Sequence, residues 1–238
     1  TFFVHKFNDI DHMSPIVYEV AKDLNKKVQI LCLNMSYDIY KDYRLNYLSK
    51  KKNIFISYYY TVYTPSIFYK ILGFMLCRKK TIFSFIPKIS MKLISLFKID
   101  INKLIQTLYN EKWVEGLYEF IKPSVLVFDH STHQGLYNMP TLNKIAKKYS
   151  IPTIDVPHGI PLYANHPKRW DKAKSTYINN VKDHMVLHHK WWEKELKDIG
   201  LNKLQTPILG SARYCNEWIE KINEILPSDS SLKNLGKD

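Results

Sequence analysis

Glycine is scarce in this sequence, and its glycines do not stand where phosphate-binding loops need them. The chain has 7 glycines, and none belongs to a GxGxxG or GxxxxGK[ST] pattern. In those patterns the glycines let the backbone curl around the phosphates of a dinucleotide or a nucleoside triphosphate. The usual dinucleotide site and the P-loop are therefore excluded, and we predict no cofactor.

Cysteine is equally scarce. Cys32, Cys77 and Cys215 are odd in number, far apart and without CxxC or Cys/His ligand spacing, which argues against a disulfide framework or structural zinc. The sequence therefore favours a reducing compartment, and we expect the cytoplasm. Residues 1–9 lack the features of a signal peptide, so we expect a core strand there.

Long apolar runs are missing, and acidic residues are in the minority. The longest apolar stretch, 67–77, contains Lys70 and is far shorter than the roughly 20 residues of a membrane-spanning helix. We predict no transmembrane segment. Lys and Arg number 35 against 22 Asp and Glu, which gives a formal charge of +13. This charge predicts attraction to nucleic acid, anionic lipid or phosphorylated substrates without selecting one of them.

Short apolar strands alternate with helical patterns along the chain. This alternation predicts βαβ units, and therefore an α/β fold with a doubly wound, mostly parallel, Rossmann-like sheet. The expected strands are 1–5, 28–33, 54–60, 124–128, 153–156, 182–187 and 207–209. The expected helices are 14–24, with Ser14 as N-cap and Pro15 in the first turn, 139–149, 190–199 and 214–226. We expect one domain over 1–213 with a basic helical insertion at 64–119, followed by a helix and linker over 214–238.

Polar side chains follow most of the predicted strands. In an open parallel sheet, ligands bind beyond the carboxyl ends of the strands, where helix N-termini also point. Residues predicted there are Asp9, Asp11 and His12, then Asp129, His130 and His133, then His158 and Gly159, then His188 and His189, and finally Gly210 to Arg213. Histidine moves protons near neutral pH, and arginine grips phosphate with a fork of donors. The set predicts transfer onto a hydroxyl from a phosphate-linked donor.

Each of these residues also has a structural interpretation. Asp11 and Asp129 can cap helices or form turns, and several histidines with Asp129 could instead ligate zinc or iron. Their spacing matches no compact metal motif, so we predict no metal. His158 differs from the others because Pro157 fixes its loop and Gly159 allows close approach of the backbone to a ligand. We therefore assign the main functional role to His158.

Three segments carry a family resemblance. Residues 151–162 include His158-Gly159-Ile-Pro-Leu, which resembles the HG-x-P-hydrophobic loop of the CDP-glycerol glycerophosphotransferase family and related GT-B enzymes. The run from 183 to the turn at Gly210–Arg213 is similar to that family's Gly-x-x-Arg turn. Residues 5–15 resemble the first-strand loop of surface-carbohydrate biosynthesis proteins. The resemblance covers about 1–60 and 120–226.

The resemblance implies a function and roles for single residues. The chain would be the acceptor-side, N-terminal half of a GT-B transferase that moves a sugar or polyol-phosphate from a nucleotide-activated donor to a growing bacterial surface glycan of capsule, lipopolysaccharide or teichoic-acid type. His158 would be the base that deprotonates the acceptor hydroxyl, and Arg213 would face the donor phosphate. The remaining substrate-binding residues would be Asp11, His12, Asp129, His130, His133 and Gly159. The second half, which holds the nucleotide, is not found in this sequence, so we expect the N-terminal part of a longer enzyme, inactive alone, or a relative that only binds.

The segment 64–108 combines lysines with apolar residues. Lys88, Lys92 and Lys98 alternate with apolar side chains over about three helical turns, as in helices that lie in the headgroup layer of an anionic membrane. The alternative is a helix that packs its apolar side on the sheet and leaves its lysines in water. Of the two, packing on the sheet is favoured. Peripheral contact with the inner face of the cell membrane is the alternative, and it would suit an enzyme that acts on a lipid-linked or glycan acceptor.

Two other functions stay open. One is a UDP-sugar epimerase-like or sugar-binding module of the same fold, since fold does not determine chemistry. The other is a nucleic-acid-binding protein, for which the charge and the 17 tyrosines would provide attraction and stacking. The basic residues are scattered and no recognition motif occurs, so we expect no nucleic-acid partner.

Overall fold

A computed structural model describes residues 1–77, 89, 92, 96, 101–129, 139–156, 182–198 and 205–226 of the 238-residue chain. The statements below concern these residues. Four of the predicted site residues, His130, His133, His158 and Gly159, lie outside them.

The centre of the fold is a six-stranded sheet in which all neighbouring strands run parallel. The strands are β1 (Phe2–Val4), β2 (Val28–Cys32), β3 (Ile54–Tyr58), β4 (Leu126–Asp129), β5 (Thr153–Val156) and β6 (His184–Met185). Their order is β3-β2-β1-β4-β5-β6. The chain therefore winds outward from β1 to β3 and then returns to build β4 to β6 on the other side. The predicted α/β, Rossmann-like parallel sheet is confirmed.

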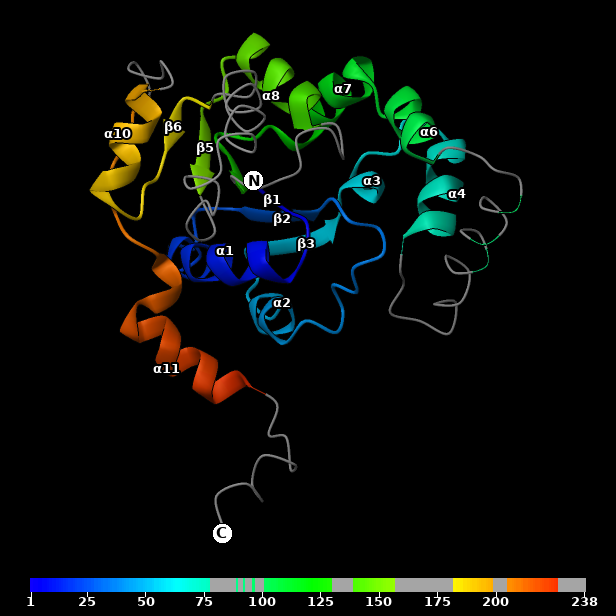
Figure 1. The fold of residues 1–238 in the computed structure, drawn as a ribbon. Coiled ribbons are helices and arrows are strands. Elements are labelled where there is room, and N and C mark those ends of the chain that lie inside the picture. The colour runs from blue at the N-terminus through cyan, green and yellow to red at the C-terminus, as the bar shows by residue number, and fades with distance from the viewer. Residues whose placement is uncertain are drawn as a thin grey trace.

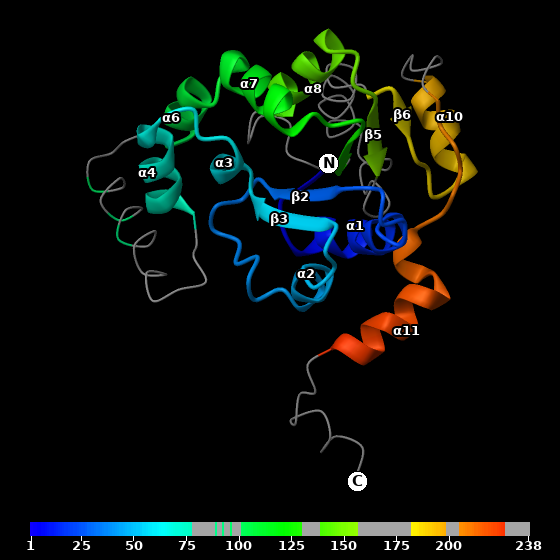
Figure 2. The same ribbon diagram turned by 180° about the vertical axis from the view of Figure 1, so that it is seen from behind.

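Helices cover both faces of this sheet. They are α1 (Phe7–Val20), α2 (Tyr43–Leu48), α3 (Tyr59–Val62), α4 (Ile67–Leu76), α6 (Ile101–Leu108), α7 (Glu111–Ile121), α8 (Met139–Lys148), α10 (Lys190–Asp198) and α11 (Asn216–Ile225), with a 3-10 turn, η2, at Ala212–Tyr214. In Figure 1, α7 and α8 lie on one side of the sheet, and α1 and α2 lie on the other. The view from behind in Figure 2 shows the same layers, with α4 and α6 beyond the arrow tip of β3 and α10 beside β6.

The two central strands are apolar, except for Asp129 at the end of β4, because both of their faces are covered. Phe2, Phe3 and Val4 of β1 are at most 5% exposed, and the ring of Phe3 stacks on that of Phe128 in β4 with 5.0 Å between centroids. Trp113 and Leu117 of α7 are buried at helical spacing on the same core. This core fixes the relative positions of the ends of β1 and β4.

The first helix begins earlier than the sequence indicates. We expected 14–24, with Ser14 as the N-cap, but α1 begins at Phe7 and contains both Ser14 and Pro15. Proline in a helix interior removes one backbone hydrogen bond, and the buried packing of α1 outweighs that loss. At the N-terminus, Asp9 accepts a hydrogen bond of 2.6 Å from the backbone N–H of His5, the residue before the N-cap Lys6. Asp11 therefore lies on a helix rather than in a loop.

Other predicted boundaries also shift. Tyr58 ends β3, because Tyr59 begins the short helix α3. The strand expected at 207–209 forms a single bridge between Leu187 and Ile208, so it extends the sheet edge without becoming a full strand. Among the helices that the structure describes, none is both long and apolar enough to cross a membrane.

Candidate functional site

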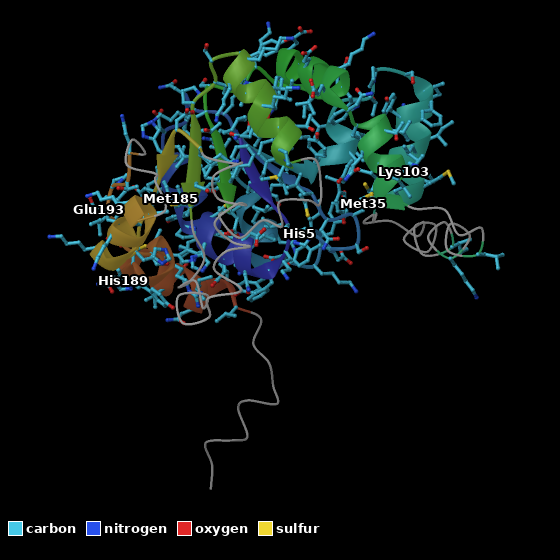
Figure 3. All side chains as sticks on the ribbon, turned by 45° about the horizontal axis from the view of Figure 1, so that its top comes forward. His5, Met35, Lys103, Met185, His189 and Glu193 are labelled. Carbon is cyan, nitrogen blue, oxygen red and sulfur yellow. The ribbon has the colours of Figure 1, made fainter. Side chains whose placement is uncertain are left out.

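The sheet has one place where its winding direction reverses, between β1 and β4. In doubly wound folds, ligands bind beside this switch point, outside the carboxyl ends of the strands. Here β1 leads through His5 and Lys6 directly into α1, and β4 ends at Asp129. In Figure 3, His5 lies near the middle of the molecule, between Lys103 on one side and His189 and Glu193 on the other. The candidate site is built from the side chains around this edge.

Two buried carboxyl groups meet at the switch point. Asp9, in the first turn of α1, is 2% exposed, and Asp129, at the end of β4, is 1% exposed. Burial, followed by the charge of Asp129 and a hydrogen bond with it, raises the pKa of Asp9 to about 9. Two carboxyl groups this close in a dry site cannot both be ionised at neutral pH. The pair therefore holds a proton, and it joins α1 to the end of β4.

A second acidic group on α1, Asp11, bridges two arginines. Its Oδ1 accepts a 2.9 Å hydrogen bond from Nη1 of Arg44, and its Oδ2 lies 3.3 Å from Nε of Arg213. Arg44 comes from α2, and Arg213 comes from η2, which is 169 residues further along the chain. The carboxylate thus connects three separate elements at this edge.

Arg44 is held in place by Asp42. Its side chain is 0% exposed, and its Nε and Nη2 donate to both oxygens of Asp42, at 3.2 and 2.7 Å. Burial alone would raise the pKa of Asp42, but the guanidinium of Arg44 outweighs burial and lowers it. The ring of Phe7 lies 4.0 Å from the guanidinium carbon of Arg44. The geometry of Arg44 is therefore fixed on several sides, and so is the orientation of Asp11.

His12, the neighbour of Asp11, holds Arg213 from the other side. Nη1 of Arg213 lies 3.2 Å from Nε2 of His12, and Ser211 Oγ lies 3.4 Å from Nδ1 of the same ring. Because a guanidinium only donates, Nε2 of His12 accepts, and the proton of the neutral ring stands on Nδ1. His12 is 5% exposed, and its ring stacks on that of His188 at 6.0 Å between centroids. In this arrangement His12 positions Arg213 instead of acting as a base.

Arg213 reaches the surface at the end of this chain of contacts. Its side chain is 36% exposed and lies over the ring of Tyr214, with 4.8 Å from the guanidinium carbon to the ring centroid. Gly210, with φ of +72°, takes the left-handed conformation that turns the chain from the sheet edge back over α1. A guanidinium fixed at Nε and at one Nη1 hydrogen keeps further donors for an anion. The arrangement is suited to binding a phosphate or a carboxylate.

The structure brings some of the predicted site residues together. Arg213 contacts both Asp11 and His12. Asp129 instead contacts Asp9. We had predicted Asp9 at this edge but had given it no role in binding. His158 and the other predicted residues His130, His133 and Gly159 lie outside the described residues, so their positions relative to this cluster are not described. Within the described ranges, no group of three or more His, Cys, Asp or Glu side chains could hold a metal ion.

Sequence reasoning missed Arg44. A signal was present, because Arg44 is one of only four arginines in a chain whose basic residues are mostly lysine. A fixed, two-pronged ion pair favours arginine over lysine. Asp42, two residues before it, is a typical N-cap residue, and its side chain does accept from the backbone N–H groups of Arg44 and Leu45.

Comparison of the chain with models of protein families, with curated proteins and with solved structures finds no match in any of the three. A functional interpretation therefore depends on the chemistry of the residues described above.

Proposed function

We propose that this chain is the acceptor-side half of a GT-B-type transferase that moves a sugar or a polyol-phosphate from a nucleotide-activated donor to a growing bacterial surface glycan. The observation that supports this most directly is the contact of Asp11, His12 and Arg213 beside the switch point of a doubly wound sheet. A partly exposed, rigidly held arginine at that place is suited to a phosphate-bearing substrate.

In the proposed reaction, Arg213 binds the phosphate of the donor and offsets the negative charge that develops as the leaving group departs. Asp11 and His12 keep its guanidinium in position, so little ordering is required when substrate arrives. His158 takes the proton from the acceptor hydroxyl, a contribution of roughly 10²- to 10⁴-fold in rate. The nucleotide itself is bound by a second Rossmann-like half outside this sequence.

The proposed location is the cytoplasmic face of the cell membrane. There the protein would be bound peripherally and would act on a lipid-linked or glycan acceptor. The basic surplus of the chain, +13 at neutral pH, supports contact with anionic lipid and with phosphorylated substrates.

The test is a transfer assay on the full natural protein that contains this chain, with a panel of nucleotide-activated sugars and polyols. We expect Arg213→Ala to lower kcat/KM by about 10- to 100-fold, because it removes a charge-assisted hydrogen-bond donor. Arg213→Lys should restore part of the loss, since it keeps the charge but not the fork. His158→Ala should abolish most turnover. Lys197→Ala, at a site 57% exposed on α10, is the matched control and should have no effect.

Full turnover in both Arg213→Ala and His158→Ala would reject the assignment. Loss of turnover in the Lys197→Ala control as well would mean that the assay reports the total charge of the protein rather than this site.

A further inference from the structure

Helix α4 turns bulky apolar side chains toward solvent. Five of its ten residues are large, apolar and at least 38% exposed: Ile67 at 70%, Phe68 at 52%, Ile71 at 53%, Phe74 at 38% and Met75 at 40%. At about 100° per residue these five positions fall within one arc of about 120°. They form a continuous apolar stripe, which we call the α4 face.

The opposite side of α4 is attached to the protein. Leu76 is 2% exposed, and Gly73 lies so close to α3 that a Cβ there would stand 2.9 Å from Cγ2 of Thr61. The hydroxyl of Tyr69 donates a 2.9 Å hydrogen bond to the backbone carbonyl of Leu108. The helix is thus held along one side, and the exposed residues of the α4 face lie on the other.

The segment that contains this face carries a surplus of positive charge in its sequence. The segment 64–108 carries eight of the 35 basic residues of the chain and a single acidic residue, Asp100. Lys70 of α4 is exposed and lies next to the apolar arc, and Lys92 is exposed between Ile89 and Leu96, which are 52% and 72% exposed. Of the three lysines that the sequence analysis singled out, Lys88 and Lys98 lie outside the described residues.

We propose that the α4 face is a docking surface for an anionic lipid bilayer. Apolar side chains flanked by lysines are suited to the boundary between headgroups and acyl chains, where the side chains enter the acyl region and the ammonium groups meet lipid phosphates. A second copy of this chain is a poorer occupant, because it would bring two segments of the same positive sign together. The inference rests on the proposed function only for its biological setting.

The position of α4 agrees with this role. Figures 1 and 2 both show α4 beyond the arrow tip of β3, whereas α10 lies beside β6 on the other side of the molecule and α11 leads away below α1. A bilayer against the α4 face would therefore meet the opposite end of the molecule from α10.

The experiment measures cosedimentation of the purified natural protein with two kinds of vesicle, phosphatidylcholine alone and phosphatidylcholine with about a third phosphatidylglycerol. We expect binding to the anionic vesicles at least about 10-fold tighter than to the neutral ones, and weakening with added salt. The double variant Phe68→Glu/Ile71→Glu should lose at least about 10-fold in binding to anionic vesicles. Leu24→Glu, at an apolar site outside α4 that is more exposed (77%) than Phe68 or Ile71, is the control and should bind like the parent.

Three results would overturn the inference: no vesicle binding by the parent, equal binding by the double variant, or an equal loss in the Leu24→Glu control. Light scattering after size exclusion gives a further check, since a dimer of the parent that dissociates in the double variant would assign the α4 face to a second copy. Far-UV circular dichroism establishes that both variants are folded. Vesicle binding without transferase activity would support this inference and reject the proposed function. Transferase activity without vesicle binding would reject this inference and support the proposed function.

Discussion

At the scale of single residues, the fold places titratable groups where water does not reach them. Asp9 and Asp129 are buried together where β1 and β4 end. A carboxyl group with a raised pKa in the folded state stabilises the fold while it is protonated, and that contribution is lost as the pH rises from its unfolded value toward its folded one. For the pKa of Asp9 this window runs from the ordinary value of 3.8 up to about 9.

Asp9→Asn should remove most of this pH dependence. An amide cannot ionise, and its oxygen can still accept from the backbone N–H of His5. We expect the free energy of unfolding of the parent to fall by a few kcal/mol between pH 6 and pH 9, and that of the variant to change much less. Urea unfolding at both pH values measures this. Asp23→Asn, at an exposed site, should retain the parent's pH dependence, and an unchanged slope in Asp9→Asn would contradict the shared proton.

Loss of the Arg44 guanidinium should destabilise the fold. Arg44→Met leaves the buried carboxylate of Asp42 without its cation, and breaking a buried pair in this way typically costs about 3–5 kcal/mol. Thermal or urea unfolding should show a loss of that size. Adding Asp42→Asn should recover part of it, because the asparagine removes the charge and still caps α2. A double variant no more stable than Arg44→Met would mean that Arg44 acts mainly through Phe7 and Asp11.

At the scale of elements, α11 is attached largely through one side chain. Trp218 is 2% exposed, and its ring centroid lies 5.7 Å from that of Tyr18 on α1. The next residue, Ile219, is 42% exposed. An apolar ring of this size contributes most of the burial that a short helix can offer.

We therefore predict that Trp218→Ala will lower the free energy of unfolding by about 3–5 kcal/mol, or release α11 from the domain, since a large aromatic side chain leaves a cavity. Ile219→Ala should cost well under about 1 kcal/mol. Chemical denaturation and hydrogen exchange over 216–225 distinguish a general loss of stability from local release. Equal effects of the two substitutions would show that α11 is not attached through the indole.

At the scale of the whole molecule, periodicity in the sequence was enough to predict the parallel α/β sheet, and β5 has the bounds that we expected. It was not enough to predict the start of α1. The signals at Ser14 and Pro15 are those of a helix start, but tertiary packing of Ile10 and Met13, each 1% exposed, begins the helix at Phe7 instead. Propensity is a weak local preference that burial overrides.

The candidate site was predictable in part for the same reason. The carboxyl ends of parallel strands share an edge, so Asp11, His12 and Arg213 were expected there, and they meet. The pairing of each carboxylate with its partner depends on the face of α1 on which that carboxylate lies. We had predicted a loop for these residues, and a loop has no regular faces from which the pairing could be predicted. The proton shared by Asp9 and Asp129, and the role of Arg44, follow from that helical geometry.

The short connection between η2 and α11 has a mechanical consequence. Only Tyr214 and Cys215 separate Arg213 from the first residue of α11. Because this link is so short, we expect a displacement of α11 to move Arg213 as well, and with it the contacts that Arg213 makes with Asp11 and His12.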